Sequence, residues 1–469
     1  MSVFEIVISV LASFGATLGS AIIFNTSKQD IVRAGIVASI GWLTYLIIKE
    51  NQCYFIKYIK VIYFIPEISR CKYYNFQSIS LILQRINDNS EFLIHLRMAL
   101  LNEYFLELPN DDLFSDVAKK INTFKVLRPH AELIDLGIND VTSPLPSSII
   151  EAMHKAVDDM ADSTRFHGYG PEQGYEFLRD SIIKNDFNTR GIHLMPNEVF
   201  INDGVKSEIG NIGDLLRSDN TIGVIDPIYP VYIESNVISG RAGIFNKGRW
   251  SNVSYLGCNE SNGFTPMPPE FPIDIVYLCS PDNPTGAAYS KGQLKKWVDY
   301  AIKNNTLILF DASYEAYIQS PNIPHSIYEI RGAKKVAIEL RSFSRTAGFT
   351  GLRCGYTIIP KELTIQTLDG RKIQMNSLWS RRQSIRFNGV SYVTQCAATA
   401  TYSELGKEQL RQTIEYYMEN VRMMRRVLSP LNLRIYGGEH IPYLWIKIPR
   451  QSSSWEFFES MLYSAKVIC

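Results

Sequence analysis

From about residue 98 onward, the chain alternates between continuous apolar runs and amphipathic segments. The apolar runs with the composition of buried β-strands are 132–138, 198–203, 221–227, 273–280, 306–313 and 335–342. Helical patterns such as GQLKKWVDYAIKNN, at 292–305, lie between them. Apolar strands separated by amphipathic helices predict an α/β fold with a mostly parallel sheet that is covered on both faces. In such a sheet we expect the functional side chains beyond the carboxyl ends of the strands.

The first 50 residues have a different pattern, with two long apolar runs at 3–24 and 31–48. The first run carries one charge, Glu5, and is about as long as the roughly 20 residues of a membrane-spanning helix. We therefore predict hydrophobic N-terminal helices that associate with a membrane; the alternative is a pair of helices buried in a soluble protein. No basic segment precedes the first run, which argues against a secretory signal peptide. Residues 51–97 are interpreted as a junction.

Composition narrows the class of protein further. The 469 residues include 48 Lys and Arg against 47 Asp and Glu, so no strong positive field would attract nucleic acid. The seven cysteines and seven histidines lack the paired spacings of a zinc site or a disulfide framework. We therefore expect no metal site, no nucleic-acid partner and, for the part after residue 98, a cytoplasmic location.

Polar side chains follow the ends of two apolar runs. Asp311 lies near the end of the run at 306–313, and Tyr314 comes three residues later. A buried carboxylate there could pair with the protonated ring nitrogen of a cofactor, or it could cap the next helix. Asn283 lies in SPDNPTG, where its amide could meet a ligand oxygen, although the stretch could also be an ordinary turn.

Two further stretches suit an anion-binding site. In NDGVKSE, at 202–208, the backbone N–H groups around Val205 and Lys206 would begin a helix, and helix N-termini bind phosphate. In SFSRTAGFTGLR, at 342–353, Ser342 and Ser344 could donate hydrogen bonds to that phosphate, and Arg353 could pair with it. Ordinary turns remain the alternative for both stretches.

An aromatic side chain, Tyr229 in DPIYPVY, could stack on a flat ring, or it could be a core tyrosine. The chain contains neither GxxxxGK[ST] nor GxGxxG, so a nucleotide-binding function has no support.

Taken in this order, the motifs resemble those of fold-type I, pyridoxal-phosphate-dependent aminotransferases. The stretches GYGPEQGYEFLR (168–179), IPHSIYEI (323–330), FNGVSY (387–392) and SSWEFFE (453–459) are similar in particular to the LL-diaminopimelate aminotransferase family. The resemblance runs from about residue 98 to the C-terminus. It implies amino transfer between LL-2,6-diaminopimelate with 2-oxoglutarate and tetrahydrodipicolinate with glutamate, in lysine biosynthesis. It also implies amino-acid and 2-oxo-acid substrates and a homodimer.

The same resemblance implies a role for each site residue. Asp311 would pair with the pyridine nitrogen, Asn283 and Tyr314 would bind the phenolic oxygen, and Tyr229 would stack on the ring. The phosphate would lie against Val205, Lys206, Ser342, Ser344 and Arg353. The substrate would contact Tyr169, Glu172 and Asn388, with Glu172 reaching across the dimer interface.

Two features depart from that family. Where its members carry the lysine that bonds covalently to the cofactor, this chain has Arg345. Arginine stays protonated, so it can serve neither as nucleophile nor as base, and pairing with the phosphate is one alternative role. The chain also ends at Cys469, where family members are expected to continue to an arginine that binds the substrate carboxylate. Smaller departures are Asn139, Ser143, His167 and Asp282.

These departures leave several interpretations open. The chain could be an impaired aminotransferase, a cofactor-binding pseudoenzyme, or the translated remnant of a decaying gene. Residues 1 to about 50, through FGATLGSAIIFN and AGIVASIGWLTYLI, resemble the small membrane subunit of threonine/serine exporters, so a membrane transport component is the rival from another class. The predicted domains are a membrane segment (1–50), a junction (51–97), an N-terminal arm with the cofactor-binding large domain (98–360), and the rest of that domain with an incomplete small α+β domain (361–469).

Overall fold

The computed structural model describes residues 99–108, 113–137, 140–448 and 453–469. The chain divides into two compact units, Met1–Leu101 and Asn102–Cys469, and the described helices and strands belong to the second unit. The hydrophobic helices and the junction that the sequence predicts within residues 1–97 lie outside the described residues. Among the residues that are described, no helix is long and apolar enough to cross a membrane.

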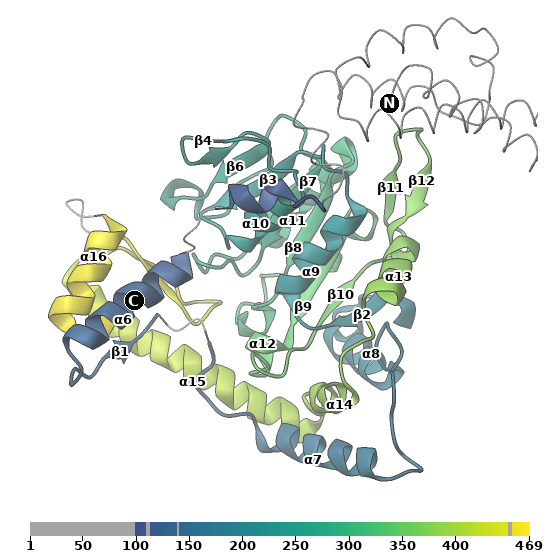
Figure 1. Cartoon of the computed structure of the whole chain (residues 1–469), viewed down its shortest axis with the longest axis horizontal. Coiled ribbons are helices and arrows are strands. Elements are labelled where there is room, and N and C mark those ends of the chain that lie inside the picture. The colour runs from purple at the N-terminus through teal and green to yellow at the C-terminus, as the bar shows by residue number, and fades with distance from the viewer. Residues whose placement is uncertain (1–98, 109–112, 138–139, 449–452) are drawn as a thin grey trace, which may run out of the picture. The chain divides into compact units, whose positions relative to one another are not determined.

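A seven-stranded sheet forms the centre of the described unit (Figure 1). Its strands, in spatial order, are β2 (Val199–Asn202), β10 (Gly355–Ile358), β9 (Ala337–Ser342), β8 (Leu307–Asp311), β7 (Ile275–Cys279), β3 (Ile222–Asp226) and β6 (Val253–Gly257). Strand β10 is antiparallel to both neighbours, and the other pairs are parallel. The mostly parallel sheet predicted from the apolar runs is therefore confirmed.

Helices cover both faces of this sheet, because consecutive residues of a strand such as β8 are apolar and buried, so both of its faces are apolar. Ile308 and Phe310 belong to one buried cluster, which includes α8 (Glu176–Ile182), α11 (Lys291–Asn304) and α14 (Tyr392–Ala400). Leu307 and Leu309 belong to a second cluster, which includes α9 (Val205–Ile212), α10 (Val231–Ile238) and α13 (Met375–Arg386). The sheet is thus the middle layer of three, as the continuous apolar runs require.

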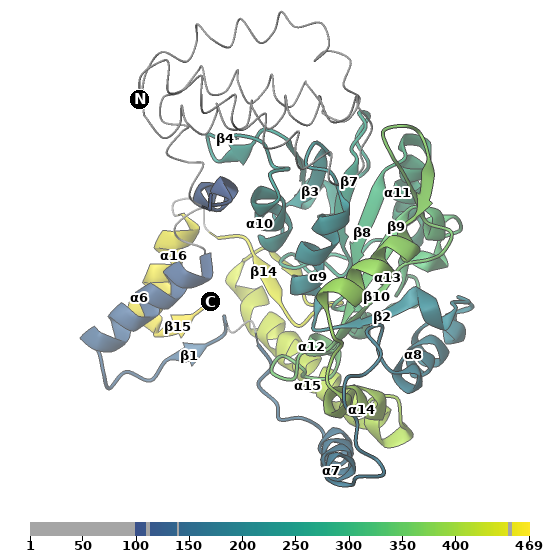
Figure 2. The same ribbon diagram turned by 45° about the vertical axis from the view of Figure 1, so that its right-hand side comes forward.

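A smaller group of elements lies beyond the end of α15 (Glu404–Leu428), the longest described helix (Figure 2). There α6 (Leu113–Leu127) packs against α16 (Ser454–Ser460) through Phe124 and Phe458. Strand β1 (Ile134–Asp135) pairs in parallel with β15 (Val467–Ile468), and β13 (Ile435–Gly437) forms a hairpin with β14 (Leu444–Ile446). The strand within the apolar run at 132–138 therefore joins this group and not the central sheet, because β1 pairs with β15 in a separate two-stranded sheet.

The remaining described elements lie at the periphery. Two short antiparallel pairs are β4 (Phe245–Asn246) with β5 (Arg249–Trp250), and β11 (Thr364–Gln366) with β12 (Lys372–Gln374). Helix α7 (Ser147–Ala161) packs against α14, and the single-turn α12 (Phe343–Thr346) follows β9.

Candidate active site

Two neighbouring strands of the sheet deliver Asp311 and Ser342 to the same edge. Strands β8 and β9 run in parallel with Asp311 opposite Leu340, so their carboxyl ends lie side by side. Tyr232, from α10, donates a hydrogen bond of 2.6 Å to Asp311 Oδ2. Ser313 donates to Oδ1 from its backbone nitrogen at 2.9 Å and from its hydroxyl at 2.6 Å. Burial raises the pKa of Asp311, and these hydrogen bonds partly offset that rise.

Tyr229 lies among the charged groups of this edge. Its ring meets that of Tyr232 edge-on, with the centroids 5.7 Å apart. Burial and the negative charge of Asp311 raise the pKa of Tyr229, while Arg345 and Arg353 lower it. Tyr229 is therefore within electrostatic range of a carboxylate and of two guanidinium groups.

An anion cradle is formed where β2, β10 and β9 lie in register, with Asn202 opposite Gly355 and Gly355 opposite Ser342. Helix α9 begins here after Gly204, whose φ of 120° suits glycine. A Cβ at Gly204 would lie 2.4 Å from Arg353 Nη2. The missing side chain therefore lets a guanidinium approach the N-terminus of a helix, and both favour an anion.

Serine hydroxyls complete this cradle. Arg353 Nη1 donates to Ser344 Oγ at 3.4 Å and to the carbonyl of Thr350 at 3.1 Å. Ser342 caps α12, because its Oγ accepts the backbone N–H of Ser344 at 3.1 Å. Of the residues suggested for an anion site, Ser342, Ser344 and Arg353 thus come together opposite the helix that begins at Val205, while the Lys206 side chain is exposed.

Arg345, on the same short helix, lies in a group of tyrosines. Its guanidinium lies over the ring of Tyr314, 5.4 Å from the centroid. Tyr314 is buried, and its hydroxyl forms a 2.6 Å hydrogen bond with that of Tyr443. Tyr317 donates a hydrogen bond of 3.3 Å to the backbone carbonyl of Arg345. Burial alone would lower the pKa of Arg345, but the tyrosines and Asp140 outweigh it and raise the pKa.

The turn after β7 carries Asn283, which is half-buried, beside the fully buried Asp282. Asp282 Oδ2 accepts hydrogen bonds from the backbone nitrogen of Thr285 at 3.2 Å and from its hydroxyl at 2.6 Å. No described group bonds the buried Oδ1 atom. Burial raises the pKa of Asp282 to about 7.

The residues suggested for substrate contact form a separate group. Tyr169 is 90% exposed, and Glu172 and Asn388 are exposed as well. Their loops adjoin each other, because Gln383 donates to the carbonyl of Glu172 at 3.3 Å and a Cβ at Gly389 would lie 3.2 Å from the carbonyl of Pro171. Within one chain, no described contact joins this group to Asp311.

Sequence reasoning missed two tyrosines that support the site. Tyr232 lies three residues after Tyr229, in the first turn of α10, so a helix predicted to start after Pro230 could have indicated it. Tyr443 bonds Tyr314 across 129 residues of sequence, and no local pattern predicts that contact. Among the described residues, no group of His, Cys, Asp and Glu side chains could hold a metal ion.

Comparison with known proteins agrees with this geometry. The family model "Aminotransferase class I and II" matches residues 131–469, and "Threonine/Serine exporter, ThrE" matches residues 9–59. The LL-diaminopimelate aminotransferase of Phocaeicola vulgatus is 62% identical over 371 residues, which cover 79% of this chain and 91% of that protein. That of Prochlorococcus marinus is 51% identical over 372 residues, with the same coverage. The solved structure of L,L-diaminopimelate aminotransferase from Chlamydomonas reinhardtii has a TM-score of 0.74 at 36% identity, covering 79% of this chain and 90% of that chain. The chain therefore belongs to the class I and II aminotransferases, fold-type I enzymes that depend on pyridoxal phosphate.

Proposed function

We propose that this chain carries the active site of an LL-diaminopimelate aminotransferase, and that Arg345 suppresses amino transfer in it. The reaction would convert tetrahydrodipicolinate and glutamate to LL-2,6-diaminopimelate and 2-oxoglutarate, in lysine biosynthesis. High identity to enzymes of that name, over nine-tenths of their length, supports this substrate class. The observation that carries the proposal is the guanidinium of Arg345 over the ring of Tyr314, in the loop from which a lysine should act.

The cradle at Gly204 supports a fit to pyridoxal phosphate in its non-covalent contacts. A Cβ there would fill the space between α9 and Arg353, where a phosphate would be bound by the N–H groups near Val205 and Lys206. Ser342, Ser344 and Arg353 would complete the phosphate site. Asp311 would hold the pyridine nitrogen, and burial among hydrogen-bond donors keeps its carboxylate in one orientation.

The remaining contacts would orient the ring. Tyr229 would cover one face of it, while Asn283 and Tyr314 would bind the phenolic oxygen, with Tyr443 fixing the Tyr314 hydroxyl. When bound, pyridoxal phosphate acts as an electron sink for the substrate's Cα. Amino transfer also needs a base that removes the Cα proton, and a permanently protonated guanidinium cannot accept it.

The test compares wild type with Arg345→Lys after addition of pyridoxal phosphate, borohydride reduction and peptide mass analysis. We expect wild type to bind the cofactor without a reduced adduct, and Arg345→Lys to form one on residue 345. Amino transfer should rise by about a thousandfold or more in the variant, because a missing nucleophile and base costs several orders of magnitude.

A matched control is Arg353→Lys, which introduces the same side chain at the other guanidinium of the site and should give no adduct. An adduct on wild type would contradict the suppressing role of Arg345. If wild type and Arg345→Lys both bind the cofactor tightly without turnover, the result would favour a cofactor-binding pseudoenzyme. If neither of these two proteins binds the cofactor, the result would favour a gene remnant.

The exposed group of Tyr169, Glu172 and Asn388 supports a homodimer as the active form. Because no described contact joins these residues to Asp311 within one chain, we propose that Glu172 and Tyr169 complete the substrate site of a second subunit. The substrates would then be amino acids and 2-oxo acids bound between subunits.

A second function concerns residues 1–50, for which the match to the exporter model at 9–59 is the supporting observation. We propose that this segment attaches the aminotransferase part to a membrane. In that part, residues 98–360 would form an N-terminal arm and most of the cofactor-binding large domain, and residues 361–469 would form the rest of the large domain and a small domain. Fractionation of the full chain and of a version lacking residues 1–97 tests the attachment. Recovery of the full chain in the soluble fraction would contradict it.

A further inference from the structure

A cavity of about 530 Å³ lies beside the two loops that carry Asp311 and Arg345, yet neither side chain lines it. Its walls come from the loop after α8, the loop after β8, α15 and the segment that follows α14. The end of β9 with α12 contributes Arg341, Ser342, Phe343 and Thr346, and β10 contributes Tyr356. The size is that of a small-molecule site. Of the residues assigned above to the cofactor, Ser342 also contributes to the wall of this cavity, and the others lie outside its lining.

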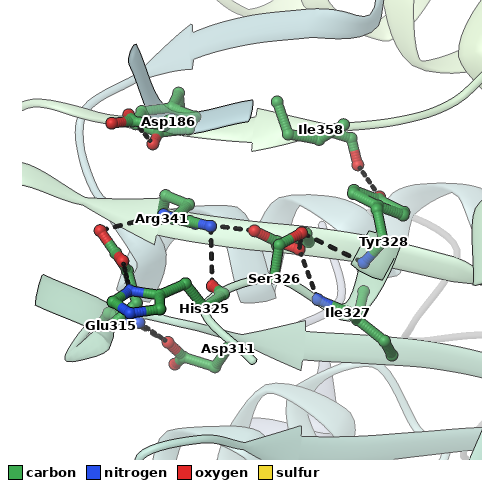
Figure 3. Close-up of polar contacts among 12 residues, drawn as sticks. Asp186, Asp311, Glu315, His325, Ser326, Ile327, Tyr328, Arg341 and Ile358 are labelled. Atoms are coloured by element: carbon green, nitrogen blue, oxygen red, sulfur yellow. Dashed lines mark hydrogen bonds and ion pairs between the residues drawn. The ribbon is translucent and has the colours of Figure 1, made fainter. Parts of the chain in front are cut away.

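Arg341 forms the centre of a buried charge network at this cavity (Figure 3). Its side chain is 2% exposed and pairs with Glu315 at 3.0 Å and with Glu339 at 2.7 Å. It also donates to the carbonyl of His325 at 2.8 Å. The second oxygen of Glu315 pairs with His325 Nδ1 at 2.8 Å, and that of Glu339 accepts from the hydroxyl of Ser326 at 2.6 Å.

Asp186 faces the same cavity without a cation of its own. The hydroxyls of Tyr356 and Tyr402 both donate to Asp186 Oδ2 at 2.6 Å. No described residue forms an ion pair with Asp186 or a hydrogen bond to its Oδ1 atom. Burial and the neighbouring charge of Glu315 raise its pKa to about 6, although Arg341 opposes that rise.

The network therefore holds more negative than positive charge. Within the network, Glu315, Glu339 and Asp186 contribute three carboxylates and Arg341 contributes one permanent cation, while Arg190 acts on Glu315 from outside it. Even with His325 protonated, the network itself would hold one more negative charge than positive charge. Asp186 is half-buried, and a carboxylate with reduced hydration and no cation bonded to it is destabilised, so a cationic ligand would stabilise its ionised form.

We propose that this cavity binds a small aliphatic amine as its ammonium ion, with the N–H group donating to Asp186 Oδ1. Apolar side chains suited to an alkyl chain line the cavity, namely Ala312, Ala316, Phe343, Leu410 and Ile414. A metal ion is a poorer occupant, because no described cluster supplies a metal's ligands. The charged side chains of α15 at the cavity, Lys407, Arg411 and Glu415, already pair with Glu404, Glu408 and Arg422.

Binding should strengthen from about pH 5 to about pH 8, as Asp186 loses its proton. Glu315 stays ionised over this range, because Arg341 and His325 hold its pKa at about 2 against the effect of burial. The charged or titratable groups near Asp186 are Tyr356, Tyr402, Glu315, Arg341, Lys407, Arg411 and Glu415, with Arg190 close to Glu315.

The test is calorimetric titration of the full chain, without added cofactor, by n-pentylammonium, with pentanoate and 1-pentanol as probes of equal length. We expect binding of n-pentylammonium alone. Asp186→Asn keeps an acceptor for the two tyrosines and should weaken that binding by about 30-fold or more. Ile414→Trp, which fills the cavity from α15, should abolish binding of n-pentylammonium. This variant replaces Asp186→Asn in the test if Asp186→Asn does not fold.

Asp311→Asn is the matched control, since it removes a buried carboxylate from the cofactor site and should leave the affinity unchanged. Equal binding of pentanoate, or no binding of n-pentylammonium, would overturn the proposal. The proposal would also be overturned if Asp311→Asn abolished binding of n-pentylammonium while Asp186→Asn retained it. The amine would then occupy the cofactor site. The readout is independent of amino transfer, so a failure of the proposed function leaves this test intact.

Discussion

Carboxylates whose pKa is raised by burial recur around the central sheet. Asp186 has a pKa of about 6, whereas those of Glu208 and Asp282 are about 7. Burial is the main cause for each, and hydrogen bonds offset only part of it. Glu208 accepts from the hydroxyl of Thr357 at 3.0 Å, while Asp282 Oδ1 has no described partner. Asp282 is therefore the position where removal of a charge should stabilise the fold most directly.

Asp282→Asn should raise the free energy of unfolding by about 1–3 kcal/mol at pH 8 relative to wild type. The folded-state pKa of about 7 exceeds the ordinary value of 3.8, so the unfolded chain loses its proton first as the pH rises. Wild type thus loses stability between about pH 4 and about pH 7, a loss that the uncharged amide avoids. Urea unfolding at pH 5 and pH 8 measures the difference.

The exposed Asp299→Asn on α11 is the matched control, since it removes a carboxylate from solvent-exposed surface. The free energy of unfolding of Asp299→Asn, relative to wild type, should show no comparable change between pH 5 and pH 8. A difference between Asp282→Asn and wild type that is the same at both pH values would argue against ionisation as its cause.

At the level of elements, the anion cradle depends on one helix start. Helix α9 begins directly after β2, and the glycine between them has a backbone conformation that other residues avoid. The same position has no room for a Cβ beside the Arg353 guanidinium. Steric fit and backbone conformation therefore both require glycine at residue 204.

Gly204→Ala should weaken binding of pyridoxal phosphate by about tenfold or more, because displacing Arg353 removes a charge-assisted contact. It should weaken binding of pyridoxal, which lacks the phosphate, much less. Equilibrium dialysis with both ligands measures the contrast. Gly248→Ala is the control, since its φ of 80° is also positive but its Cβ would meet open space. Equal losses for both ligands would contradict a phosphate-specific role.

The elements also explain what the sequence could and could not predict. Apolar runs indicated β2, β3, β7, β8 and β9, and the strand ends indicated where Asp311 and Ser342 would lie, because parallel strands share one carboxyl edge. The run at 132–138 was misassigned to that sheet, since apolar composition cannot say which strand will be its neighbour. The contacts of Tyr443 and Arg341 join distant segments, so only tertiary packing defines them.

At the scale of the whole molecule, exposed apolar side chains occur on the loop before α8 and at the end of α13, which adjoins that loop. Tyr169 is 90% exposed and Phe166 61%, while Ile385, close to Asn388, is 69% exposed. A patch of this kind, beside polar residues expected to contact substrate, is typical of a protein–protein interface. Its continuity with the loop of Glu172 favours a second copy of this chain as the partner.

The double variant Tyr169→Asp with Ile385→Asp should shift the described unit's assembly from dimer to monomer. Two carboxylates in the centre of an apolar contact would lose hydration without gaining partners, which costs several kcal/mol. A loss of this size is enough to dissociate a dimer of ordinary affinity. Sedimentation velocity on the full chain, kept in detergent throughout, measures the mass of each species. Ile302→Asp, on the exposed side of α11, is the matched control and should leave the dimer intact. A wild-type monomer, or a double variant that still dimerises, would contradict both the interface and the shared substrate site, because Glu172 would then have no second subunit to reach.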